Sequence, residues 1–176
     1  MLAINVAGLL GSTAGTTRRY PVADLRLDLG DDLLQAEPIV GSVRLTRTNR
    51  GLLVDGRLAT ALVERCGRCL TPIVAPVEID LREEALPTVD LESGQRLDPA
   101  QEPDVLHIDE HHVLDLEPAV RDAISLAEPM KVLCREACAG LCPDCGRDLN
   151  VEPHRHEREP DPRLAPLARL LDEERT

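Results

Sequence analysis

The sequence predicts an α+β fold, in which an antiparallel β meander curls into a partly open barrel and one helix packs against it. Apolar and polar residues alternate over residues 20–30, which is typical of a half-buried strand, and residues 38–86 contain the strongest β pattern. A helical spacing of apolar residues follows at 115–128, and a cysteine-rich segment comes after it. Because only 1% of the residues are aromatic, the core must be built from Leu, Val, Ala and Ile.

The N-terminal part of the chain predicts two strands. Residues 2–10, "LAINVAGLL", indicate a short strand that ends in a turn at "GSTAG". Residues 20–30 alternate apolar and polar positions and end at Gly30, which indicates a second, half-buried strand.

Residues 38–86 give the strongest β signal. "IVGSVRLTR" reaches the turn "TNRG", where Asn49 and Gly51 tolerate the left-handed backbone that a hairpin turn uses. The chain reverses again at "CGRCLTP", and "IVAPVEIDLREEAL" returns as a third strand. We therefore expect a three-stranded antiparallel meander with the first cysteine pair, Cys66 and Cys69, at a strand-to-strand turn.

The second half of the chain predicts a loop and two helices. Residues 87–113 form an acidic, proline-containing loop with one short strand near its end. Asp115 caps a helix over 115–128, and Pro118 lies in its first turn. The expected units are a sheet domain with this loop and helix, a Cys/His-rich segment, and a C-terminal helix, at residues 1–133, 134–160 and 161–176.

The charge distribution is polarised. The net charge of −12 argues against a protein that coats nucleic acid electrostatically. Residues 43–69 nevertheless carry a local charge of +4, whereas residues 78–122 carry −11. The basic stretch leaves room for contact with RNA phosphates, and the candidate residues are Arg44, Arg47, Arg50, Arg65 and Arg68.

The sequence predicts a cytoplasmic protein. The apolar start "MLAINVAGLL" is too short to span a membrane and has no basic region before it. In a reducing compartment, closely spaced cysteine pairs predict metal or redox chemistry rather than disulfides.

Two CxxC motifs indicate zinc. "CGRC" at 66–69 has a glycine within the turn, and "CPDCG" at 142–146 has Pro143 at its start and Gly146 in a position that permits positive φ. Zinc prefers four sulfur or imidazole ligands in a tetrahedron, and a CxxC turn brings two sulfurs to one ion. The C-terminal segment is therefore expected to be stapled by zinc.

The sequence leaves two ligand allocations open. One is a single local site formed by Cys134, Cys138, Cys142 and Cys145, which leaves Cys66 and Cys69 without a partner. The other has two tetrahedral sites, because "HRH" offers two imidazoles on one side of an extended segment. The two sets in this second division are Cys66, Cys69, Cys134 and Cys138, and Cys142, Cys145, His154 and His156.

Other chemistries fit the pattern less well. A redox dithiol usually lies at a helix N-terminus, whereas Thr71, Pro72 and a strand pattern follow "CGRC". A thiol redox or metal-responsive switch remains the alternative function. No HExxH, GxSxG, P-loop or GxGxxG motif occurs, and filled cysteine-rich tetrahedra are structural, so the sequence predicts a protein that is not an enzyme.

The order of motifs resembles the YceD family over nearly the whole chain. The matching stretches are "NVAGLLGSTAGTTRRYPV", "VERCGRCLTPI", "EPMKVLCREACAGLCPDCGRDLN" and "DPRLAPLARLLDEE". The resemblance implies a bacterial cytoplasmic factor that supports 23S rRNA accumulation in large-subunit biogenesis, without enzymatic activity. Its implied partners are 23S rRNA or large-subunit ribosomal proteins. Some similar sequences have C-x-C where His154 and His156 stand here, which suits the two-site division.

Overall fold

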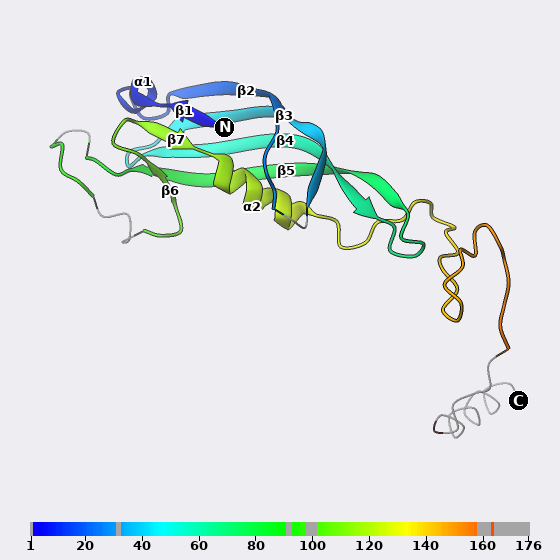
Figure 1. The fold of residues 1–176 in the computed structure, drawn as a ribbon. Coiled ribbons are helices and arrows are strands. Elements are labelled where there is room, and N and C mark those ends of the chain that lie inside the picture. Colours follow the sequence, from blue (N-terminus) through cyan, green and yellow to red (C-terminus); the bar gives the residue numbers. More distant parts are fainter. Residues whose placement is uncertain (1, 31–32, 91–92, 98–101, 158–162, 164–176) are drawn as a thin grey trace, which may run out of the picture.

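A computed structural model describes residues 2–30, 33–90, 93–97, 102–157 and 163. The helix predicted at 161–176 lies outside these residues, apart from position 163. The predicted α+β class is confirmed: one curled sheet forms a half-barrel, a helix packs against it, and the cysteine-rich segment extends from one end (Figure 1). Among the described residues, no helix is both long and apolar enough to cross a membrane.

The sheet contains seven strands in the order β1-β7-β6-β5-β4-β3-β2. Neighbouring strands are antiparallel, except that β5 and β6 are parallel. The long strands β3, β4 and β5 are joined by tight reversals and form the centre of the sheet. The elements in chain order are β1 (Ala3–Asn5), α1 (Ala7–Leu10), β2 (Thr17–Leu25), β3 (Leu34–Arg47), β4 (Leu52–Arg65), β5 (Pro72–Pro87), β6 (Leu106–Ile108), β7 (Val113–Asp115) and α2 (Glu117–Ala127).

The two faces of the central sheet differ in chemistry. In β4, Leu52, Val54 and Leu58 are buried, whereas Leu53 and Arg57 between them point to solvent. This alternation follows from the two-residue period of a strand. The buried face packs against α2 and the N-terminal segment, so the opposite face of β3, β4 and β5 is left to solvent (Figure 1).

The helix α2 docks on the buried face. The Asp115 carboxylate accepts a hydrogen bond from the Glu117 amide at 2.9 Å. The N-cap residue is nevertheless Leu116, without a side-chain cap, so the expectation that Asp115 caps the helix is wrong. Val120 and Ile124 are fully buried against the sheet. Arg121 donates through Nε to the carbonyl oxygen of Asp28 at 2.9 Å, which ties the helix to the segment after β2.

Three expectations about elements need correction. The strand predicted at 2–10 is only β1, because the chain leaves the sheet after Asn5 and forms the short helix α1, which buries Leu9 and Leu10. The loop predicted at 87–113 contains β6 and the start of β7, so it provides two strands instead of one. The meander of three strands is thus the centre of a sheet of seven.

The turn between β3 and β4 uses glycine for a different reason than predicted. Neither Asn49 nor Gly51 has a positive φ. A Cβ atom on Gly51 would instead lie 2.1 Å from the carbonyl oxygen of Ala85 in β5. Glycine is therefore required there because β5 approaches the backbone closely.

Candidate metal centres and a basic hollow

The first CxxC motif forms the turn between β4 and β5. The Cys66 amide donates to the carbonyl oxygen of Thr71, and the Leu70 amide donates to the carbonyl oxygen of Cys66, both at 2.9 Å. Leu70 closes the turn with φ of 60°, a conformation that non-glycine residues rarely adopt. This turn brings the sulfurs of Cys66 and Cys69 to one side.

The second CxxC motif repeats this geometry. The Gly146 amide donates to the carbonyl oxygen of Cys142 at 2.8 Å, and Gly146 has φ of 72°. The expectation that Gly146 takes a positive φ is therefore confirmed. Two turns far apart in the chain thus share one hydrogen-bond pattern and present two sulfurs each.

The first set of predicted ligands converges. The sulfurs of Cys66 and Cys138 are 3.8 Å apart, and those of Cys69 and Cys134 are 3.6 Å apart. All four sulfurs lie within 4.8 Å of one another. A tetrahedral zinc site with Zn–S bonds of ~2.3 Å has S···S edges of ~3.8 Å, so this arrangement fits a zinc ion.

Polar groups around the first set fix its geometry. Arg68 donates through Nη1 to the carbonyl oxygen of Cys138 at 2.7 Å, and the Gly67 amide donates to the carbonyl oxygen of Val132 at 2.8 Å. Asn150 donates through Nδ2 to the sulfur of Cys138 at 3.5 Å, and its Oδ1 accepts from the Ala139 amide at 2.8 Å. Such outer contacts orient ligands and stabilise thiolates.

The second set also converges. The side chains of Cys142, Cys145, His154 and His156 place their ligand atoms within 4.8 Å of one another. The Cys145 sulfur lies 3.1 Å from Nε2 of His154, while Nδ1 of His154 lies 2.8 Å from the carbonyl oxygen of Glu152. Because a carbonyl oxygen only accepts, Nδ1 carries a proton, and the lone pair on Nε2 faces the cysteines as a metal ligand requires.

The thiol electrostatics favour a cation in both sets. Backbone amides, first that of Cys69, lower the pKa of Cys66 to about 6. The Cys145 amide is the largest cause that lowers the pKa of Cys142 to about 6. In contrast, the hydrogen bond with the Cys69 side chain raises the pKa of Cys134 to about 12. Four adjacent sulfurs cannot all ionise by themselves, whereas a divalent cation would let every one act as a thiolate.

The two sets differ in access to solvent. Cys66 and Cys138 are buried in the first set, and only Cys134 is exposed. In the second set Cys145 and His156 are exposed, beside a surface cavity that is also lined by Arg147, Glu152 and Pro153. Each set offers four protein ligands and leaves no open position for a substrate, which is the arrangement of structural zinc sites.

The five arginines selected for RNA contact lie in different environments. Arg47 donates through Nε to the carbonyl oxygen of Leu10 at 2.9 Å and through Nη1 to the carbonyl oxygen of Gly51 at 3.0 Å. Arg68 braces Cys138, as described above, and Arg50 forms an ion pair with Glu102. Arg65 is exposed at the end of β4. The structure therefore does not gather the five into one surface.

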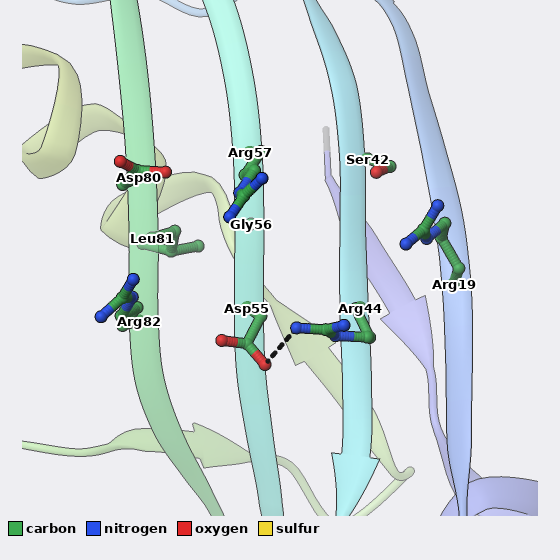
Figure 2. A pocket seen from close by; sticks show the side chains of 9 residues that line it. All are labelled: Arg19, Ser42, Arg44, Asp55, Gly56, Arg57, Asp80, Leu81 and Arg82. Atoms are coloured by element: carbon green, nitrogen blue, oxygen red, sulfur yellow. Dashed lines mark hydrogen bonds and ion pairs between the residues drawn. The ribbon is translucent and has the colours of Figure 1, made fainter.

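One of the five, Arg44, lies in a hollow of about 210 Å³ on the solvent face of the sheet. Figure 2 shows the arginine side chains that line it, one from each of four neighbouring strands. Arg19, Arg57 and Arg82 were not predicted from the sequence, although the register of the hairpin formed by β3 and β4 places Arg57 opposite Ser42, two residues from Arg44. The lining residues are Arg19, Ser42, Arg44, Asp55, Gly56, Arg57, Asp80, Leu81 and Arg82.

Comparison with known proteins places these features in a family. The family model described as "Large ribosomal RNA subunit accumulation protein YceD" matches residues 54–171, about two-thirds of the chain. An uncharacterized protein of Mycobacterium tuberculosis is 37% identical over 134 residues, which cover 75% of this chain and 61% of that protein. The protein YlbN of Bacillus subtilis is 28% identical over 148 residues, or 83% of this chain and 81% of that protein.

A plant relative carries a functional name. "Large ribosomal RNA subunit accumulation protein YCED homolog 1, chloroplastic" of Zea mays is 30% identical over 168 residues, or 81% of this chain and 57% of that protein. The chain spans about three-fifths of the length of its mycobacterial relatives. No solved structure matches. Because the family model covers more than half of its residues, this chain belongs to the YceD family.

Proposed function

We propose that this chain is a non-enzymatic factor that supports the accumulation of 23S rRNA during assembly of the large ribosomal subunit in the cytoplasm. The observation that carries the proposal is the family match over residues 54–171, which includes both CxxC motifs. The printed name of the maize relative, which refers to large-subunit rRNA accumulation, supports the same function. The partner is 23S rRNA, a precursor of it, or a large-subunit ribosomal protein.

We infer that two structural zinc ions hold the C-terminal segment. The first would be bound by Cys66, Cys69, Cys134 and Cys138, and the second by Cys142, Cys145, His154 and His156. The convergence of the ligand atoms and the proton on Nδ1 of His154 support this inference. When bound, zinc neutralises adjacent thiolates and cross-links their backbones.

The first centre would connect distant parts of the chain. It joins the turn between β4 and β5 to the segment after α2, across 64 intervening residues between Cys69 and Cys134. A structural zinc ion contributes ~10–16 kcal/mol of apparent binding free energy, which is comparable with a whole-domain stability of ~5–15 kcal/mol. We therefore expect the position of the segment after α2 to depend on metal.

Deletion of the gene in its host tests the function. The measurement is the ratio of 23S to 16S rRNA and the sucrose-gradient profile of ribosomal subunits. We expect the deletion to lower the 23S share and the wild-type gene to restore it. If the 23S share and the subunit profile are unchanged by deletion, the proposed function is wrong.

Thiol titration of the native protein tests the redox alternative. A switch would show two reactive thiols and reversible oxidation of Cys66 and Cys69. A zinc clamp would show six thiols that become reactive only after a chelator is added. The position of "CGRC" in a turn before β5, with no helix following it, supports the clamp.

A further inference from the structure

The basic hollow is built from two adjacent cross-strand rows. In the first row, Arg19 of β2 faces Arg44 of β3, Arg44 faces Asp55 of β4, and Asp55 faces Arg82 of β5. In the second row, Ser42 of β3 faces Arg57 of β4, and Arg57 faces Asp80 of β5. All these side chains lie on the solvent face of the sheet, opposite the packed core (Figure 2).

The cations of the hollow are only partly neutralised. Arg44 pairs with Asp55 at 3.4 Å. Arg19, Arg57 and Arg82 make no ion pair with any other residue that the structure describes. Four guanidinium groups therefore share two carboxylates, and the hollow carries a formal surplus of two positive charges in a chain with a net charge of −12.

We infer that this hollow binds the phosphodiester backbone of large-subunit rRNA, an inference that rests on the proposed function and names a binding surface for it. Guanidinium groups donate paired hydrogen bonds to phosphate oxygens, and a serine hydroxyl such as that of Ser42 adds a donor. None of the described lining residues is aromatic, so the hollow has no aromatic platform for bases, and its guanidinium groups favour contact with the backbone.

The dimensions favour a polymer over a single phosphate. Adjacent strands lie ~4.8 Å apart, so the row from Arg19 to Arg82 crosses three strand spacings, or about 14 Å. A chain of phosphates can follow such a row, whereas one inorganic phosphate contacts only part of it. An acidic protein segment fits less well, because the hollow offers only Leu81 and Gly56 as apolar lining and lacks the apolar centre of a protein interface.

The test compares two double variants that lose the same charge. Arg19→Ala/Arg57→Ala removes two unpaired cations of the hollow, and Arg26→Ala/Arg96→Ala removes two exposed cations elsewhere. The full zinc-loaded chain is titrated into a fluorescein-labelled 30-nucleotide segment of the host 23S rRNA, and binding is followed by anisotropy at several salt concentrations. Equal melting temperatures confirm that both variants fold.

We expect the hollow variant to bind at least about tenfold more weakly than wild type, since two charge-assisted contacts are lost. Its plot of log affinity against log salt should become shallower by about 1.4, which corresponds to two fewer released counterions on a single strand. The control variant should keep the wild-type slope. Equal losses for both double variants would mean diffuse charge attraction and would overturn the inference.

A third variant removes a negative charge from the hollow instead of positive ones. Asp80→Asn removes an anion from the hollow and should tighten RNA binding, which a merely structural role of these residues does not predict. Unchanged or weaker binding by Asp80→Asn contradicts the proposal. Inorganic phosphate at constant ionic strength should fail to displace the RNA, and displacement would identify a small-anion site instead.

Complementation separates this inference from the proposed function. If the wild-type gene restores 23S rRNA in the deletion strain and the hollow variant binds RNA as wild type does, the hollow is not the RNA surface although the function stands. If wild-type protein binds ribosomal proteins but no RNA, the inference is also overturned. If the wild-type gene restores nothing, the proposed function itself fails.

Discussion

The sulfurs of Cys66 and Cys138 lie 3.8 Å apart although 72 positions separate the two residues in the chain. Cys66 lies in the turn between β4 and β5, and Cys138 follows α2. Both residues are buried, so an ion between them would be shielded from water. The contact between these two residues therefore connects the sheet to the C-terminal segment.

Removal of Cys138 should cost one zinc ion. We expect Cys138→Ser to reduce the zinc content from two ions to one, measured by native mass spectrometry. Hydrogen exchange should rise across residues 132–150, because the metal cross-link to the sheet is lost. Asn150→Ala is a second variant at the same centre, with a smaller expected effect. It should keep two zinc ions at saturation but weaken zinc affinity about 10–100-fold, because the hydrogen bond from Asn150 to the Cys138 sulfur is lost.

The histidine pair supplies a second prediction. His154→Ala/His156→Ala should also reduce the zinc content from two ions to one, because it removes half of one ligand set. His107→Ala/His111→Ala is the matched control, since neither residue belongs to a described metal-binding group. One zinc ion in both wild type and the histidine variant would support a single local four-cysteine site.

The two centres should release metal at different rates. Cys145 and His156 are exposed, whereas Cys66 and Cys138 are buried. A chelator such as EDTA should therefore remove the second ion first and give two kinetic phases of zinc release, detected with a zinc-sensitive dye. The fast phase should vanish in His154→Ala/His156→Ala. A single phase in wild type would contradict this order.

The packing of α2 gives a stability prediction. Ile124 is fully buried against the sheet, and Ile124→Ala should lower the free energy of unfolding by about 2–5 kcal/mol. Leu126, two residues later, is 88% exposed, so Leu126→Ala should change it by no more than about 0.5 kcal/mol. Urea denaturation followed by circular dichroism measures both. Similar losses would mean that the helix does not dock through this face.

The contact at Gly51 gives a prediction about backbone approach. Gly51→Ala places a Cβ atom 2.1 Å from the carbonyl oxygen of Ala85, so β4 and β5 must separate locally. We expect a loss of about 1–3 kcal/mol in unfolding free energy, as for other overpacked sites. Gly11→Ala is the control, because its Cβ atom would meet nothing closer than 3.7 Å. A neutral Gly51→Ala would show that the turn adapts freely.

The cysteine and histidine pattern was informative because ligand chemistry restricts the choices. The sequence alone could not decide between one local set and two divided sets, since spacing does not reveal which turns meet in space. The structure brings Cys66 and Cys69 to Cys134 and Cys138, which depends on where α2 docks on the sheet. The docking of α2 depends on contacts between distant parts of the chain, which cysteine spacing does not reveal. The matching geometry of the two CxxC turns is local, so the sequence predicts it.

The basic hollow was harder to predict for a related reason. Arg44 was selected from charge density along the chain, but its neighbours come from β2, β4 and β5. A strand presents only alternate residues to one face, so Arg47, close in sequence, reaches the carbonyl oxygens of Leu10 and Gly51 instead. Short elements such as α1, β6 and β7 were misjudged because three or four residues carry too little periodicity.

The strand β5 begins at the cysteine-bearing turn and reaches Arg82 ten residues later, a distance of about 33 Å along the strand. A continuous hydrogen-bonded strand thus spans the two sites, while the described core residues beneath the hollow are apolar and include none of the proposed metal ligands. If both proposals hold, a cell starved of zinc would lose the anchorage of the C-terminal segment and keep the arginine surface intact. The protein would then fail in stages as zinc becomes scarce, instead of unfolding as a whole.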